Sequence, residues 1–124
     1  MNVVDSSAWL EFFAGGPNAE HFAKPVTDLA RLIVPSIALL EVFKRILQQR
    51  DENAALRAVA AMHQGRVVDL DREMALAAAK LGHTLKLPLA DSVILATARQ
   101  YHATLWTQDA DFKGLEGVRY FSKT

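Results

Sequence analysis

Hydrophobic positions in the chain follow two patterns. The first consists of short, nearly continuous apolar runs, which are typical of strands buried on both faces of a sheet. Four such runs end in polar or turn residues: NVVD at 2–5, LIV at 32–34 before a turn at Pro35, RVVDL at 66–70 and ATLWT at 103–107. A fifth run, GVRYF at 117–121, is expected as an edge strand.

The second pattern repeats apolar residues every three or four positions and predicts helices. Ser6 or Ser7 is expected to cap the first helix, which ends at the GGP turn of 15–17. Pro88 suits the first turn of the last helix. The other expected helices cover 19–30 with a break or kink near Pro25, 36–50, 52–64, 72–85 and 89–101.

Strands that alternate with helices predict an α/β protein. The expected fold has three α/β/α layers around a central, mainly parallel sheet of four to five strands, in a single domain over 1–124. Fourteen basic residues balance fourteen acidic ones, so net charge gives no indication of nucleic-acid binding. The absence of cysteine excludes disulfides and thiolate metal sites. The chain shows no secretory signal and no transmembrane run, so a cytoplasmic location without membrane contact is expected.

Acidic residues recur where predicted strands end and helices begin. Asp5 closes the first strand, and Asp109 and Asp111 follow the fourth. Glu41 and Asp91 lie in the early turns of two predicted helices. Ligands of open α/β sheets bind at the carboxyl ends of the strands, so these acids could meet there. Since like charges repel, such a cluster requires a cation, and Mg²⁺ and Mn²⁺ favour oxygen ligands.

Each acid also has a purely structural explanation. Asp5 can accept hydrogen bonds from the first amides of the following helix. Glu41 can pair with Arg45 four residues later, which contributes only a few tenths of a kcal/mol. Asp91 suits the helix dipole, but its apolar neighbours indicate deep burial, and a buried carboxylate without a cation is costly. The two acids after the fourth strand can be ordinary turn residues.

Four sequence blocks together resemble a known family. They are VVDSSAWLEFF, VPSIALLEVFKR, KLPLADSVILATARQ and LWTQDADF. In order and spacing they are similar to the blocks of the PIN domain, and most similar to those of VapC-type toxins of toxin–antitoxin modules. The resemblance covers nearly the whole chain.

The resemblance implies a metal-dependent ribonuclease that uses Mg²⁺ or Mn²⁺. The family's acids fall on Asp5, Glu41, Asp91 and Asp109, which are the expected catalytic and metal-binding residues. Ser6, Thr107 and Asp111 are the expected supporting residues. The implied partners are an RNA substrate, a cognate antitoxin protein and a second copy in a homodimer. A PIN-like nuclease without a toxin role, or an inactive nucleic-acid or protein binding module, remains as an alternative.

Weaker signals come from aromatic and basic residues. Trp9, Phe12 and Phe13 are too close in sequence all to face inward, so at least one is expected to be exposed. They serve either core packing or, as the resemblance implies, an antitoxin groove. The four histidines share no metal-binding spacing and are expected at the surface or at helix ends. The basic residues on the Glu41 and Asp91 helices are either RNA contacts or solvated surface residues, namely Lys44, Arg45 and Arg99.

Overall fold

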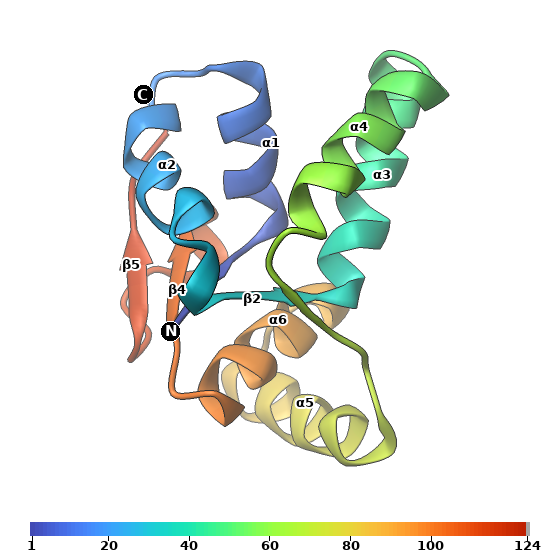
Figure 1. The fold of residues 1–124 in the computed structure, drawn as a ribbon. Helices are drawn as coiled ribbons and strands as arrows, with labels where there is room; N and C mark the ends of the chain where they lie inside the picture. Colours follow the sequence, from blue (N-terminus) through green and yellow to red (C-terminus); the bar gives the residue numbers. More distant parts are fainter. Residues whose placement is uncertain (124) are drawn as a thin grey trace.

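A five-stranded parallel sheet forms the centre of the computed structural model, which describes residues 1–123 (Figure 1). Its strands are β1 (Asn2–Val4), β2 (Leu32–Pro35), β3 (Arg66–Val68), β4 (Thr104–Thr107) and β5 (Val118–Tyr120). They lie in the order β3-β2-β1-β4-β5, with Val3 beside Ile33 on one side and Leu105 on the other. The predicted parallel sheet and its edge strand β5 are confirmed.

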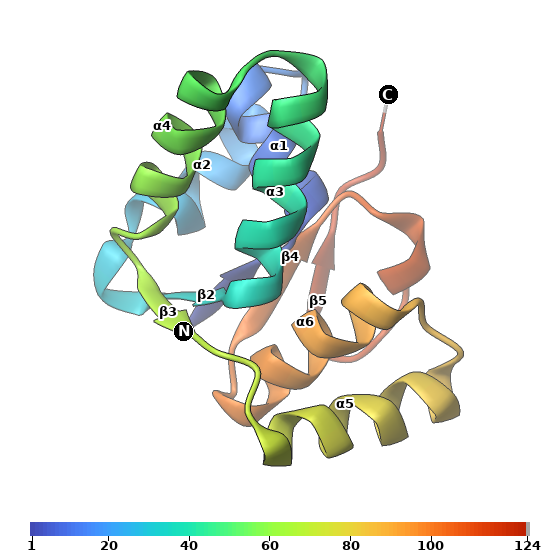
Figure 2. The same ribbon diagram turned by 90° about the vertical axis from the view of Figure 1, so that its right-hand side faces the viewer.

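Helices cover both faces of the sheet, so the predicted three layers are confirmed (Figures 1 and 2). On one face lie α1 (Ser6–Ala14), α2 (Ala19–Thr27), α3 (Ser36–Gln49) and α4 (Glu52–Met62). On the other lie α5 (Arg72–Leu85) and α6 (Leu89–Gln100). Two 3-10 turns complete the described elements, η1 (Leu29–Arg31) and η2 (Ala110–Phe112). No helix within 1–123 has the length and apolar character needed to cross a bilayer.

The continuous apolar runs are explained by this sandwich. Alternate strand residues point to opposite faces. Val3 and Leu105 therefore pack with Ile94 of α6, whereas Val4 and Trp106 belong to the core under α1 to α4. Because both faces are covered, neither set of side chains can be polar.

The N-caps of two helices differ from the sequence prediction. Asp5, and not Ser6 or Ser7, is the N-cap of α1, since its side chain accepts a hydrogen bond from the backbone amide of Ala8. Pro88 stands at the N-cap of α6 instead of in its first turn. Extended backbone at Pro88 ends the connection from α5, and the helix starts at the next residue.

The second predicted helix was too long. It ends at Thr27, and the chain continues through Asp28 into the 3-10 turn of Leu29–Arg31. Pro25 lies inside α2, near its C-terminal end, and is buried against the core. Burial of this ring and of its neighbour Val26 offsets the missing amide hydrogen bond.

Gly82 lets α5 approach α6, the helix that carries Asp91. A Cβ at Gly82 would lie 2.2 Å from the Oγ atom and 2.9 Å from the Cβ atom of Ser92. The Ser92 hydroxyl is already held, because it donates to the carbonyl of Pro88 at 2.9 Å. The glycine that weakens α5 by its low helix propensity is thus required by packing.

We expect Gly82→Ala to destabilise the protein. The better helix propensity of alanine contributes about 1 kcal/mol, but overpacking against Ser92 costs about 1–3 kcal/mol. Urea unfolding should show a net loss of about 1 kcal/mol, and the loss should shrink in a background that also carries Ser92→Gly. A gain in stability on Gly82→Ala would show that helix propensity outweighs the contact.

Candidate metal centre

The strand order places a ligand-binding edge between β1 and β4. The chain leaves β1 for β2 on one side of it, and later enters β4 on its other side. This reversal is a topological switch point, where the carboxyl ends of two neighbouring strands leave a crevice. Asp5 follows β1 directly, and Asp109 lies two residues beyond the end of β4.

Asp5 is an almost fully buried carboxylate, with 2% of its surface exposed. Its Oδ1 atom accepts hydrogen bonds from the Ser7 hydroxyl at 2.8 Å and from the Ala8 amide at 3.2 Å. Burial raises the pKa of Asp5 to about 7, and the charge of Asp109 adds to this effect. Hydrogen bonds from Ser7, Ala8 and Thr107 lower this pKa but do not cancel the loss of hydration. The capping role and a place in the acid cluster therefore coexist in one side chain.

Asp91, Asp109 and Asp111 form the tightest group of acids. Each offers a carboxylate oxygen, and these oxygens lie within 4.8 Å of one another. The loop after β4 fixes two of them: the Asp109 amide donates to the Thr107 hydroxyl oxygen at 2.9 Å, and Asp109 Oδ1 accepts from the Asp111 amide at 2.9 Å. Asp111 was predicted as a supporting residue, but its carboxylate is as close to this group as that of Asp109.

Glu41, on α3, lies outside this close group of three, but its charge adds to the pKa of Asp91, and its side chain is held by a serine. Its Oε1 atom accepts a hydrogen bond from the Ser6 hydroxyl at 2.6 Å. The possible ion pair between Glu41 and Arg45 is not formed, since the pair of Arg31 with Asp28 is the only ion pair within residues 1–123. Ser6 is thus a positioning residue for Glu41.

The pKa of Asp91 depends on the charges of the other four acids. Loss of hydration on partial burial raises the pKa of Asp91 to about 7, followed in size by the charges of Asp109, Asp5, Asp111 and Glu41. The prediction of deep burial was wrong, because Asp91 is only half-buried and its neighbour Leu89 is 84% exposed. The apolar residues near Asp91 in sequence lie on both faces of α6, so they do not indicate how deeply the first turn of the helix is buried.

A divalent cation fits this arrangement of carboxylates. Mg²⁺ binds oxygen ligands at 2.0–2.1 Å in an octahedron, which puts neighbouring ligands about 3 Å apart and opposite ligands about 4 Å apart. The oxygens of Asp91, Asp109 and Asp111 need little movement to meet that spacing. No lysine or arginine within the described chain neutralises these acids by an ion pair. Loss of hydration and the neighbouring negative charges raise the pKa of Asp5 and of Asp91, and a cation held between the acids would lower both.

Other residues considered in the sequence fall outside the acid cluster. Trp9 is a core residue with 1% exposure and stacks on Phe13. Phe12 and Phe13 are half-buried against the same core, so none of the three is fully exposed. The histidines all lie at the surface, as predicted.

Sequence reasoning missed two polar residues near the site. Asn18 and Gln108 are buried, and Asn18 Nδ2 donates to Gln108 Oε1 at 3.1 Å. This bond holds the chain segment just before Asp109. The two residues are 90 positions apart, and nothing in the local sequence indicates that they pair.

Comparisons with known proteins agree with this fold. The sequence profile of the PIN domain family matches residues 3–118. No curated protein matches the chain by sequence. Solved structures similar in fold include a toxin–antitoxin complex from Klebsiella pneumoniae, with 24% identity over 96% of both chains and a TM-score of 0.80. Others are a sarcin–ricin-loop-cleaving VapC toxin from Mycobacterium tuberculosis (18% identity, 96% of this chain and 99% of that one, TM-score 0.77) and a DNA-bound VapBC from Salmonella typhimurium (17%, 98% of both, 0.73).

We expect the stability of the metal-free protein to fall between pH 4 and 7. Asp5 and Asp91 have folded pKa values near 7, against 3.8 for an ordinary aspartate. The folded state therefore binds more protons than the unfolded chain in this window, and the stabilisation is lost as pH rises through the folded pKa. Thermal melts in chelator from pH 4 to 8 measure the effect.

Mn²⁺ should restore the lost stability above pH 7. At about 100 times its dissociation constant, it adds ~2.7 kcal/mol to the unfolding free energy. Asp91→Asn should stabilise the metal-free protein and reduce the gain from Mn²⁺. Asp51→Asn is the matched control, because Asp51 caps α4 at a site away from the acid cluster. If Mn²⁺ and Mg²⁺ leave the wild-type melting temperature unchanged, the acids do not form a shared metal site.

Proposed function

The chain belongs to the PIN domain family, and we propose that it is a Mg²⁺- or Mn²⁺-dependent endoribonuclease that serves as the toxin of a toxin–antitoxin pair. The observation that carries the proposal is the group of carboxylates within 4.8 Å of one another at the switch point of the sheet. Asp5, Glu41, Asp91 and Asp109 are the proposed metal-binding and catalytic residues. Asp111 joins them because of its position in the group.

A cation in this site supplies the chemistry that phosphodiester hydrolysis needs. When bound, Mg²⁺ or Mn²⁺ lowers the pKa of water and stabilises charge on a phosphate. The protein's own residues hold the carboxylates in place: Ser6 donates to Glu41, and Ser7 donates to Asp5. A phosphate-bearing substrate is favoured over a neutral one, because an anion is attracted more strongly than a neutral group to a cation held in this position.

Water is the nucleophile in this proposal. The hydroxyls of Ser6 and Ser7 are engaged by carboxylates, and that of Thr107 accepts from the Asp109 amide. A serine nucleophile also needs a neighbouring base such as histidine, and the four histidines lie exposed at the surface. None of these three hydroxyls is therefore arranged to attack the phosphorus itself.

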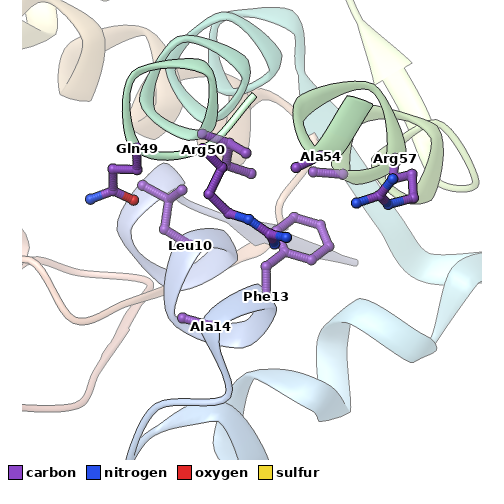
Figure 3. A pocket seen from close by; sticks show the side chains of 9 residues that line it. Leu10, Phe13, Ala14, Gln49, Arg50, Ala54 and Arg57 are labelled. Atoms are coloured by element: carbon purple, nitrogen blue, oxygen red, sulfur yellow. The ribbon is translucent and has the colours of Figure 1, made fainter. Parts of the chain in front are cut away.

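A groove beside α1 is the proposed docking surface for an antitoxin (Figure 3). Its volume is about 280 Å³. In Figure 3, Leu10 and Phe13 of α1 face Arg50, the residue that ends α3, and Arg57 of α4. The sequence left core packing and an antitoxin groove as alternatives for the aromatic residues of α1; Trp9 is buried and Phe13 lines the groove, so we propose the antitoxin contact for Phe13.

The proposed occupant is an antitoxin segment that combines an apolar face with an acidic residue. Leu10, Phe13 and Ile46 supply the apolar lining, and Arg50 and Arg57 supply two positive charges. Neither arginine is ion-paired within the described part of the chain. The Klebsiella pneumoniae neighbour is a toxin–antitoxin complex, which supports a protein partner of this class. We also propose that the protein forms a homodimer, and this part of the proposal rests on the family resemblance alone.

RNA sequencing tests the proposed function directly. Expression of the protein with and without a co-expressed candidate antitoxin, followed by mapping of RNA 5′ ends, should reveal new ends only without the antitoxin. New ends that the partner does not suppress would favour a nuclease of RNA processing. Cleavage of DNA but not RNA by the purified protein would change the substrate class. If the purified protein cleaves neither RNA nor DNA in the presence of Mn²⁺, the remaining alternative is an inactive binding module.

We expect Asp91→Asn to abolish most ribonuclease activity while the fold is retained. Asparagine keeps the shape and still suits the first helical turn, but it removes one negative ligand. Loss of an outer-sphere partner of a metal commonly costs about 10–100-fold, so loss of a ligand should cost about 100-fold or more. Cleavage of purified RNA with Mn²⁺ measures this, and Asp71→Asn, at a helix cap on α5, is the matched control. Near wild-type cleavage by Asp91→Asn would remove Asp91 from the site.

We expect Arg57→Glu to weaken the antitoxin complex more than it changes RNA cleavage. Arg57 is exposed and lines the groove, so charge reversal adds repulsion toward an acidic partner without disturbing the core. Calorimetry should show an affinity loss of about tenfold or more, whereas Arg72→Glu on exposed α5 should bind as wild type. An unchanged dissociation constant for Arg57→Glu would exclude this groove as the docking surface.

A further inference from the structure

A second hollow, here called the α1–α3 cleft, is lined by residues of α1 and α3 and by none of α4. Its volume is about 380 Å³, and Ser7 and Gln108 line it. Ser7 donates a hydrogen bond to Asp5, and Gln108 directly precedes Asp109. The cleft therefore borders the metal centre at two points. Arg45 and Lys123 also line it, so it carries positive charge.

Arg45 is available in this cleft because Glu41 is bonded elsewhere. The two side chains are four residues apart on α3, a spacing that normally favours a pair. Glu41 instead accepts a hydrogen bond from Ser6 at 2.6 Å. Arg45 is exposed and forms no ion pair within residues 1–123. Its guanidinium is thus free to bind an anion one helical turn from the acids.

Lys123 is brought to the cleft by a buried asparagine. Asn18 Nδ2 donates to Gln108 Oε1 and to the Ser122 carbonyl, both at 3.1 Å. These bonds tie the segment before Lys123 to the loop that carries Asp109. Glu11, the one carboxylate in the cleft lining, accepts from the Asn18 amide at 2.8 Å. This hydrogen bond stabilises the negative charge of Glu11 and weakens its repulsion of an incoming anion.

An acidic centre that cleaves a polyanion needs cations nearby. The carboxylates repel the phosphates on either side of the bond to be cut, and a chain with zero net charge offers no general attraction. A single metal site compensates only for the phosphate that it contacts. The flanking phosphates need separate positive groups at a distance of one or two nucleotides.

We propose that Arg45 and Lys123 form a phosphate subsite that holds the RNA strand beside the scissile bond. The inference rests on the proposed ribonuclease function and names positioning residues for its substrate. RNA is favoured over an acidic protein segment because two cleft residues are direct neighbours of site acids, Ser7 by its hydrogen bond to Asp5 and Gln108 as the residue before Asp109. The groove next to α4, lined by Phe13 and Ile46, is the more apolar of the two hollows and suits a protein chain.

The test compares Arg45→Gln and Lys123→Gln with the wild type. The substrate is an RNA oligonucleotide that spans a cleavage site mapped as above, with Mn²⁺ at several KCl concentrations. Each variant should raise KM about threefold to tenfold and leave kcat within about twofold, since a flanking contact binds ground and transition states alike. The dependence of log KM on log salt should become shallower by about 0.7 per lost phosphate contact. Arg72→Gln and Lys80→Gln, exposed on α5, are the matched controls.

A second measurement separates this proposal from the proposed function. Fluorescence anisotropy of a mixed-sequence 20-nucleotide RNA in chelator reports binding without turnover. Weaker binding by both variants supports the subsite, even if the wild type cleaves no RNA and the ribonuclease proposal fails. Unchanged KM, salt dependence and RNA binding in both variants overturn the subsite while wild-type cleavage upholds the function. If the variants bind RNA as the wild type does but lose affinity for the antitoxin, the cleft is a protein contact and the proposal is overturned.

Discussion

Repulsion between carboxylates at the carboxyl ends of β1 and β4 is the constraint on which the site depends. Asp5 is buried beneath the crevice, and Asp91, Asp109 and Asp111 converge above it. Neither loss of hydration nor like charge is relieved by a basic side chain, and the pKa of Asp5 and of Asp91 rises to about 7 as a result. A cluster of this kind costs stability, so the remainder of the fold has to hold it together.

Backbone hydrogen bonds hold the acid-bearing segments in place against this repulsion. Asp5 follows a central strand paired on both sides, and its own amide donates to the Trp106 carbonyl of β4 at 3.1 Å. This bond between the strands fixes the two acid-bearing segments in register, and within the second segment the Thr107 hydroxyl oxygen accepts from the Asp109 amide. On the opposite face, Gly82 lets α5 support the helix that carries Asp91. Strain at the site is thereby opposed by packing in both layers.

Most of the fold was predictable because its signals are local. The apolar runs NVV and TLWT predicted buried strands, and both form strands of the sheet. Asp51 and Asp71 cap their helices by accepting hydrogen bonds from amides three residues later. The candidate acids were recognisable from their positions at element ends and from the family resemblance. Contacts across long sequence separations were not predictable. The pairing of Ser6 with Glu41 and of Asn18 with Gln108 depends on the relative placement of helices and strands, which periodicity does not encode. The half-burial of Asp91 was missed for the same reason.

The proposed antitoxin groove and the proposed RNA cleft share one wall. Leu10, Ala14 and Gln49 line both hollows, which lie on the two sides of the contact between α1 and α3. Occupants of adjoining hollows with common lining residues compete wherever their atoms overlap, and such competition appears as a positive, unfavourable coupling free energy between the two ligands. A partner bound in the groove next to α4 would therefore be well placed to hinder the RNA strand without contacting the acids. Substitution of a shared wall residue perturbs both hollows at once. Residues that line one hollow alone, Arg57 for the groove and Arg45 for the cleft, are the ones whose effects can distinguish the binding of a protein from the binding of RNA.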